Sequence, residues 1–171
     1  MLTGCRRLFI FANFLMFQVG WAIAVMLGSR AAIAYVIFAG TLHFYYSTTR
    51  RFDYCAVLPL FAIGYLHDVA LLLTGVLVIG DSIIPPPWLS AIWVLLGLTL
   101  NHSLHFIYRN KILASLLGAV GGAVAYSAGV KLSGAQWGIL DGWGSLIIAF
   151  AWLFILPLHY SLMKKFVQVE T

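Results

Sequence analysis

Residues 54–79 read YCAVLPLFAIGYLHDVALLLTGVLVI, the most continuous apolar run in the chain. A helix needs about 20 mainly apolar residues to cross a bilayer, so this run predicts a transmembrane helix. The pair His67-Asp68 lies near its middle. A carboxylate at mid-bilayer costs about 2.5–3.5 kcal/mol on insertion scales, so its position alone makes Asp68 a candidate functional residue.

Five further apolar runs flank this one, at residues 8–28, 31–47, 88–107, 112–130 and 143–163. The chain is 63% hydrophobic and 9% charged, with a mean hydropathy of +0.99. A soluble domain is about one quarter charged, which excludes that class. The connections are too short to fold separately. We therefore expect a single domain over residues 1–171, an all-α integral membrane bundle of six transmembrane helices.

The basic residues predict the orientation of this bundle, because cytoplasmic loops are enriched in Lys and Arg. The predicted outer side carries Arg30 and Lys131, together with Asp81 and Asp141. The other eight of the ten basic residues fall on the opposite side, at Arg6, Arg7, Arg50, Arg51, Arg109, Lys111, Lys164 and Lys165. We expect a bacterial inner-membrane protein with both termini in the cytoplasm. Nucleic-acid binding is not expected, because the basic residues form no single stripe.

Polar residues inside the predicted helices indicate a binding site. In the run 88–107, Asn101, His102 and His105 fit in a helical arc of about 100°. Polar side chains in lipid turn inward to find partners. Taken singly, Asn13 and Gln18 are more typical of hydrogen bonds between helices, and His43 and His159 also suit the membrane interface. We expect a polar pocket open to the cytoplasm, formed by Asn13, Gln18, His43, Asp68, Asn101, His102, His105 and His159.

Four of the buried or clustered polar residues are candidate acid and base groups: Asp68, His67, His102 and His105. The spacing of His102 and His105, with Asp68 as a third ligand, is a weak metal pattern in a chain with five histidines. We expect neither a metal nor another cofactor. The chain has no nucleophile elbow, phosphate-binding loop or dinucleotide fingerprint.

Small residues form two ladders along the run 112–130. Such ladders let helix backbones approach closely. The favoured interpretation is packing within the bundle, and the alternative is dimerisation through one face. The glycines of these ladders are Gly118, Gly121, Gly122 and Gly129.

Three stretches carry a resemblance to a known family. They are residues 13–21 (NFLMFQVGW), Pro87-Trp88 through Trp93 with residues 99–104 (TLNHSL), and residues 117–122 (LGAVGG) followed by Tyr126, Gly129 and Gly134. Together they resemble small proteobacterial inner-membrane proteins catalogued as a domain of unknown function, over nearly the whole chain. Members of that family often carry proline where this chain has Ala123. The resemblance implies association with fatty-acyl modification, for example with cyclopropane-synthase-like methyltransferases, and it transfers no catalytic residue.

Three functions are compatible with these observations. We expect an accessory or scaffold protein for membrane-lipid or fatty-acyl modification, with membrane lipids and lipid-modifying enzymes as partners. The first alternative is an intramembrane enzyme that uses Asp68 and the histidines. The second is a small proton-coupled transporter in which Asp68 carries the proton.

Overall fold

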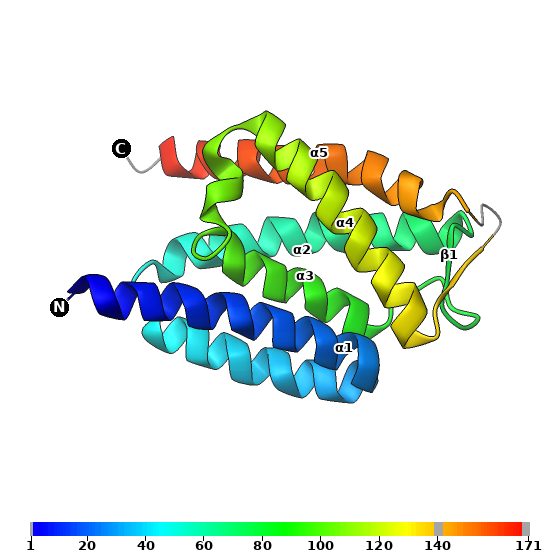
Figure 1. Ribbon diagram of the computed structural model, residues 1–171, viewed down its shortest axis with the longest axis horizontal. Coiled ribbons are helices and arrows are strands. Elements are labelled where there is room, and N and C mark those ends of the chain that lie inside the picture. The colour runs from blue at the N-terminus through cyan, green and yellow to red at the C-terminus, as the bar shows by residue number, and fades with distance from the viewer. Residues whose placement is uncertain (1, 139–141, 169–171) are drawn as a thin grey trace.

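The computed structural model describes residues 2–138 and 142–168. Within them the chain forms α1 (Leu2–Tyr46), α2 (Arg50–Leu73), β1 (Leu77–Val78), α3 (Pro87–Leu100), the 3-10 helix η1 (His105–Arg109), α4 (Lys111–Ser133), β2 (Gln136–Trp137) and α5 (Gly144–Gln168). The helices lie roughly along one axis, and the start of α1 and the end of α5 lie at the same end of the bundle (Figure 1). The two short strands lie at the opposite end.

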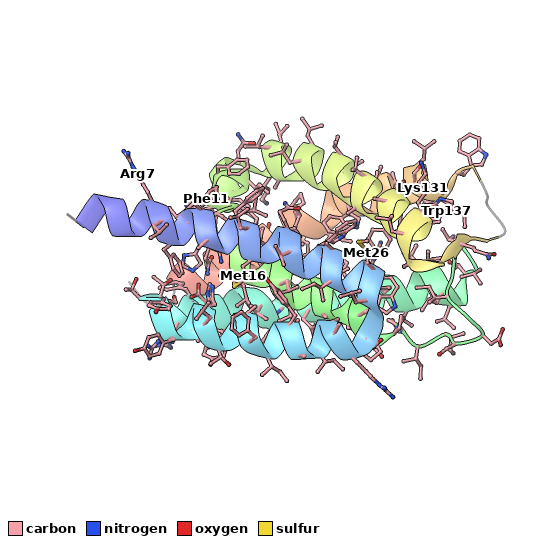
Figure 2. All side chains as sticks on the ribbon, turned by 60° about the horizontal axis from the view of Figure 1, so that its bottom comes forward. Arg7, Phe11, Met16, Met26, Lys131 and Trp137 are labelled. Carbon is pink, nitrogen blue, oxygen red and sulfur yellow. The ribbon has the colours of Figure 1, made fainter. Side chains whose placement is uncertain are left out.

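Helix α1 is a hairpin of two arms rather than one rod. Gly28 has non-helical dihedrals, φ 75° and ψ −166°, in a region that favours glycine. The two arms return side by side (Figures 1 and 2). Tyr35 on the second arm donates to the Met16 carbonyl on the first at 2.8 Å. The runs expected as separate helices at 8–28 and 31–47 are therefore the two arms of α1.

Four helices are long and apolar enough to cross a membrane: α1, α2, α4 and α5. Helix α3 has 14 residues, or about 21 Å at 1.5 Å per residue, against a hydrocarbon core of about 30 Å. The described residues thus form an all-α, multi-pass protein with four candidate spans. The six separate crossings expected from the sequence are not shown.

The expectation of one helix over 88–107 is wrong. Helix α3 ends at Leu100, and the chain turns before η1 begins at His105. The backbone N–H groups of His102 and Leu104 both donate to the Thr99 carbonyl, at 3.0 and 2.9 Å, which ends the regular helical pattern. The side chains of residues 101–103 then reach other helices, as described below.

The run 54–79 also differs from the expected helix. Helix α2 begins earlier, at Arg50, and ends at Leu73, because Gly75 turns the chain with φ 66°. The residues after it form β1, which pairs antiparallel with β2 through Leu77–Trp137 and Val78–Gln136. This pair joins the ends of α2 and α4. The expected outer-side residue Asp141 lies outside the described residues.

Helices α4 and α5 pack closely through two of the predicted glycines. A Cβ on Gly118 would lie 2.8 Å from the Trp152 carbonyl oxygen, and one on Gly122 would lie 2.5 Å from the Trp152 ring. Ser115 of α4 donates to the Leu153 carbonyl at 2.9 Å. That carbonyl has lost its helical partner, because Pro157 has no N–H. The sequence of α4 therefore fits α5 by both shape and hydrogen bonding.

Candidate functional site

Two carboxylates are buried in α2. Asp53 is 1% exposed and Asp68 is fully buried. They are about 22 Å apart along the helix, at 1.5 Å per residue. Since each burial is costly without partners, the hydrogen bonds around each acid define what it can do.

The first acid is surrounded by what we call the Asp53 centre: Asp53, His43, Ser47, Asn101 and His102. Asp53 Oδ2 accepts from His43 Nε2 at 3.0 Å and from Ser47 Oγ at 2.5 Å. Asp53 Oδ1 accepts from His102 Nε2 at 2.9 Å and from Asn101 Nδ2 at 3.2 Å. The donors come from α1, from the turn that follows it and from the turn that follows α3. One carboxylate therefore joins three parts of the chain to α2.

Asn13 on the first arm of α1 supports this centre. Its Nδ2 donates to the Leu98 carbonyl at 3.0 Å and lies 3.3 Å from His43 Nδ1. Its Oδ1 accepts from Ser103 Oγ at 2.7 Å and from the Ser103 N–H at 3.3 Å. These partners fix the orientation of the amide, so His43 Nδ1 must be an acceptor. The proton of a neutral His43 then lies on Nε2, where it is donated to Asp53.

The same geometry tests whether the centre suits a metal. His43, Asp53 and His102 offer ligand atoms within 4.8 Å of one another. Nitrogen and carboxylate donors of this kind suit zinc or iron. However, a histidine that ligates through Nε2 carries its proton on Nδ1 and needs an acceptor there. Asn13 presents an N–H to Nδ1 instead, so this arrangement does not fit a metal bound through His43 Nε2.

The second acid forms the Asp68 centre with His67, Trp93 and Tyr126. Trp93 Nε1 donates to Asp68 Oδ2 at 2.7 Å, and the Tyr126 hydroxyl donates to Oδ1. His67 Nδ1 lies 3.1 Å from Oδ1. Within residues 2–138 and 142–168, His67 Nε2 and Trp152 Nε1 are buried without a hydrogen-bond partner. The Asp68 carboxylate is thus held by neutral donors from α3 and α4 and by its neighbour on α2.

An apolar cavity of about 430 Å³ adjoins the Asp68 centre. Gly129 is buried on its wall, yet a Cβ there would meet no heavy atom within 4 Å. Its lining includes the exposed residues Gln18 of α1 and Gly121 and Val124 of α4, so the cavity reaches the outer surface between these helices. Aromatic side chains form much of the remaining wall, at Phe17, Trp21, Trp88, Trp93, Tyr126 and Trp152.

A second cavity of about 520 Å³, lined by both polar and apolar side chains, lies by the end of the bundle that holds the start of α1 (Figure 1). We call it the polar cavity, because its lining includes Lys164, His105 and Asn101. Residues 101–109 separate the two cavities. Leu104 and Ile107 line the apolar one, whereas Asn101, His105 and Tyr108 line the polar one. The other residues of the polar cavity are Thr49, Phe52, Tyr160, Met163 and Lys164.

His159 lies beside this polar cavity but is fully buried. Its Nε2 donates to the Ala56 carbonyl at 2.8 Å, so its Nδ1 accepts from the Tyr108 hydroxyl. Burial raises the pKa of Tyr108, so the phenol keeps its proton and acts as the donor. His159 therefore joins α5 to α2 and η1 as a neutral side chain.

The structure distributes the eight expected pocket residues over several places. Asn13, His43, Asn101 and His102 meet around Asp53. The other four lie elsewhere: Asp68 in its own centre, Gln18 on the apolar cavity, His105 exposed on the polar cavity, and His159 against Ala56. Of the predicted packing glycines, Gly121 and Gly129 line the apolar cavity instead of contacting a helix.

Sequence reasoning missed Asp53, which follows Arg50-Arg51 and resembles an interfacial acid. A signal for it exists in the spacing along α2. Asp53 is seven residues before Leu60, which lies four before Gly64 and eight before Asp68, so all four share one helical stripe. The structure buries this whole stripe.

These features define a multi-pass α-helical membrane protein with two buried carboxylate centres and two cavities. The chain belongs to the family described as "Protein of unknown function (DUF2878)", which it matches over residues 10–158. The resemblance found in the sequence is thereby confirmed. Neither the comparison with curated proteins nor the comparison with solved structures finds a match.

Proposed function

We propose that this protein binds an acyl chain in its apolar cavity and acts as an accessory or scaffold protein for modification of membrane lipids. The observation that carries the proposal is the cavity itself. Its volume of about 430 Å³ lies in the range of small-molecule sites, about 300–1,000 Å³. It opens between α1 and α4 on a surface of exposed apolar side chains, where lipid chains are the available ligands.

The proposal includes a bacterial inner-membrane location with six crossings and cytoplasmic termini. Each arm of α1 would cross once, and α3 would cross together with residues 101–107. Non-helical backbone at membrane depth is tolerated where it is covered by protein or lines a cavity, as these residues do. In Figure 2, Arg7 lies at one end of the bundle, and Lys131 and Trp137 lie at the other.

Reporter fusions test this topology. Fusions after Arg51, Lys111 and Lys165 should report the cytoplasm, because most basic residues lie on that side. Fusions near Asp81 and Gly134 should report the periplasm. A periplasmic signal from the C-terminal fusion would overturn the six-crossing arrangement.

Ligand binding in the cavity is tested by filling it. Gly129→Leu places an apolar side chain where a Cβ meets no heavy atom within 4 Å. Gly40→Leu is the matched control, because Gly40 also has free space but does not line the cavity. Native mass spectrometry of the detergent-purified proteins should find less lipid retained by Gly129→Leu than by the wild type and by Gly40→Leu. Equal retention in all three, with equal thermal stability, would reject an acyl-binding cavity.

An intramembrane enzyme or a proton-coupled transporter that uses Asp68 is the second candidate. One observation favours it: Tyr126 lines the cavity and also donates to Asp68. A ligand in the cavity would therefore lie one side chain away from a carboxylate. Substitution of Asp68 by Asn separates this candidate from the scaffold.

A further inference from the structure

We propose that the polar cavity beside residues 101–109 binds the phosphate group of an anionic ligand. The site is formed by Thr49, Asn101, His105, Tyr160 and Lys164. The phosphate site does not depend on the apolar cavity. Its assignment to a lipid headgroup, rather than to a soluble phosphate compound, rests on the proposed function.

The chemistry of the lining favours an anion. Beside the apolar Phe52 and Met163, its polar groups are an ammonium group, an imidazole, an amide and hydroxyl groups, and the lining contains no carboxylate. Lys164 Nζ lies 4.9 Å from the centre of the Tyr160 ring, which holds the charge near the cavity. Neither Lys164 nor His105 pairs with an acid among the described residues. A lysine in such a place binds phosphate as a point charge with several donors.

The nearest described acid, Asp53, does not oppose this assignment. Its carboxylate is 1% exposed and accepts hydrogen bonds from four side chains of the Asp53 centre and from Thr49. Asn101 and Thr49 lie between the two sites, because both line the cavity and both donate to Asp53, at 3.2 and 3.5 Å. The negative charge is therefore directed into the protein and shared among inward-facing donors.

The position of the cavity adds a second argument. Residues 101–109 present Leu104 and Ile107 to the apolar cavity and Asn101, His105 and Tyr108 to the polar one. One wall thus separates a site for an apolar chain from a site for a charged group. Membrane phospholipids carry both an acyl chain and a phosphate headgroup, so neighbouring lipid molecules can supply the ligands of the two sites.

The experiment compares two charge-removing variants from the same end of the bundle. Lys164→Gln removes the ammonium group from the cavity, whereas Lys111→Gln removes an exposed charge that does not line it. Each protein is placed in phosphatidylcholine nanodiscs that contain a minor share of phosphatidylglycerol. Phosphatidylglycerol retained after detergent release is measured by native mass spectrometry. We expect about a tenfold weaker retention in Lys164→Gln, the effect of one charge-assisted contact, and less than about a twofold change in Lys111→Gln.

A competition arm identifies the source of the phosphate. If inorganic phosphate or glycerol 3-phosphate binds the detergent-purified wild type and not Lys164→Gln, the site takes a soluble phosphate compound. If neither binds while phosphatidylglycerol retention depends on Lys164, the ligand is a lipid headgroup. Equal behaviour of Lys164→Gln and Lys111→Gln in both arms would overturn the phosphate site. Repeating the measurement in Gly129→Leu keeps the two proposals apart, because Lys164 dependence there would persist even if no acyl chain enters the apolar cavity.

Discussion

The two buried acids of α2 are held in different ways. Asp53 accepts hydrogen bonds from residues of α1, of the turn after α1 and of the turn after α3. Asp68 accepts from Trp93 and Tyr126, and both of these side chains line the apolar cavity. The first acid therefore joins distant segments of the chain, and the second lies behind the wall of a candidate binding site.

The partners of each carboxylate, rather than its burial, distinguish the two centres. Asp53 has more partners than Asp68, and Asn13 further orients one of them, His43. A saturated network of this kind stabilises one arrangement of helices. Asp68 has fewer partners, and two of them, Trp93 and Tyr126, pack against Trp152 on the wall of the apolar cavity. The hydrogen bonds of Asp68 therefore involve side chains that a ligand in the cavity would touch.

The largest loss of stability is expected for Asp53→Ala. The substitution leaves the buried donors of His43, His102 and Asn101 without an acceptor. Breaking a buried charged network costs about 3–5 kcal/mol of unfolding free energy. Thermal unfolding of the purified protein, followed by tryptophan fluorescence, should show a large fall in Tm. Asp81→Asn is the control, because Asp81 is exposed. If Asp53→Ala melts like Asp81→Asn, the Asp53 centre does not stabilise the bundle.

A smaller effect on stability, and a sharper one on function, is expected for Asp68→Asn. The variant keeps the shape but presents an N–H₂ to one of the donors, Trp93 Nε1 or the Tyr126 hydroxyl. The two donors that then face each other lower the unfolding free energy by about 1–3 kcal/mol. The lipid profile of a deletion strain that carries the variant is the measurement that separates the functions.

For an enzyme or a transporter, Asp68→Asn should fail to restore the lipid profile although it inserts normally, because the proton-carrying group is gone. A scaffold should tolerate it. Restoration of the wild-type profile would therefore leave the scaffold as the remaining proposal. Asp81→Asn, which should restore the profile in every case, controls for expression.

The all-α, multi-pass class and the approximate positions of most helices could be predicted from the apolar runs, because helices in lipid must satisfy their own backbone. The ends of α3 could not be predicted in this way. Just after Leu100, where α3 ends, His102 and Ser103 bind Asp53 and Asn13, which are far away in the sequence. No local pattern carries that information.

The candidate site was predictable only in part, for a similar reason. Helical spacing correctly groups small residues on α4, but it does not say which neighbour each ladder meets. Gly122 contacts Trp152, whereas Gly129 faces empty space on the cavity wall. Both cavities form between segments distant in sequence, so their lining depends on packing that the sequence does not display.

The smallest effects separate two histidines that the sequence places in one arc, His102 and His105. His102 donates to Asp53 at 2.9 Å and its side chain is 12% exposed. His102→Gln should lower the unfolding free energy by about 1 kcal/mol, because glutamine retains a donor but not the same reach. His105 is exposed on the polar cavity, so His105→Gln should change the unfolding free energy by less than about 0.5 kcal/mol. Paired denaturant titrations in one detergent measure both values. Equal losses in the two variants would mean that residues 101–109 continue α3 with both histidines inward, and the separation of the two cavities by this segment would then be wrong.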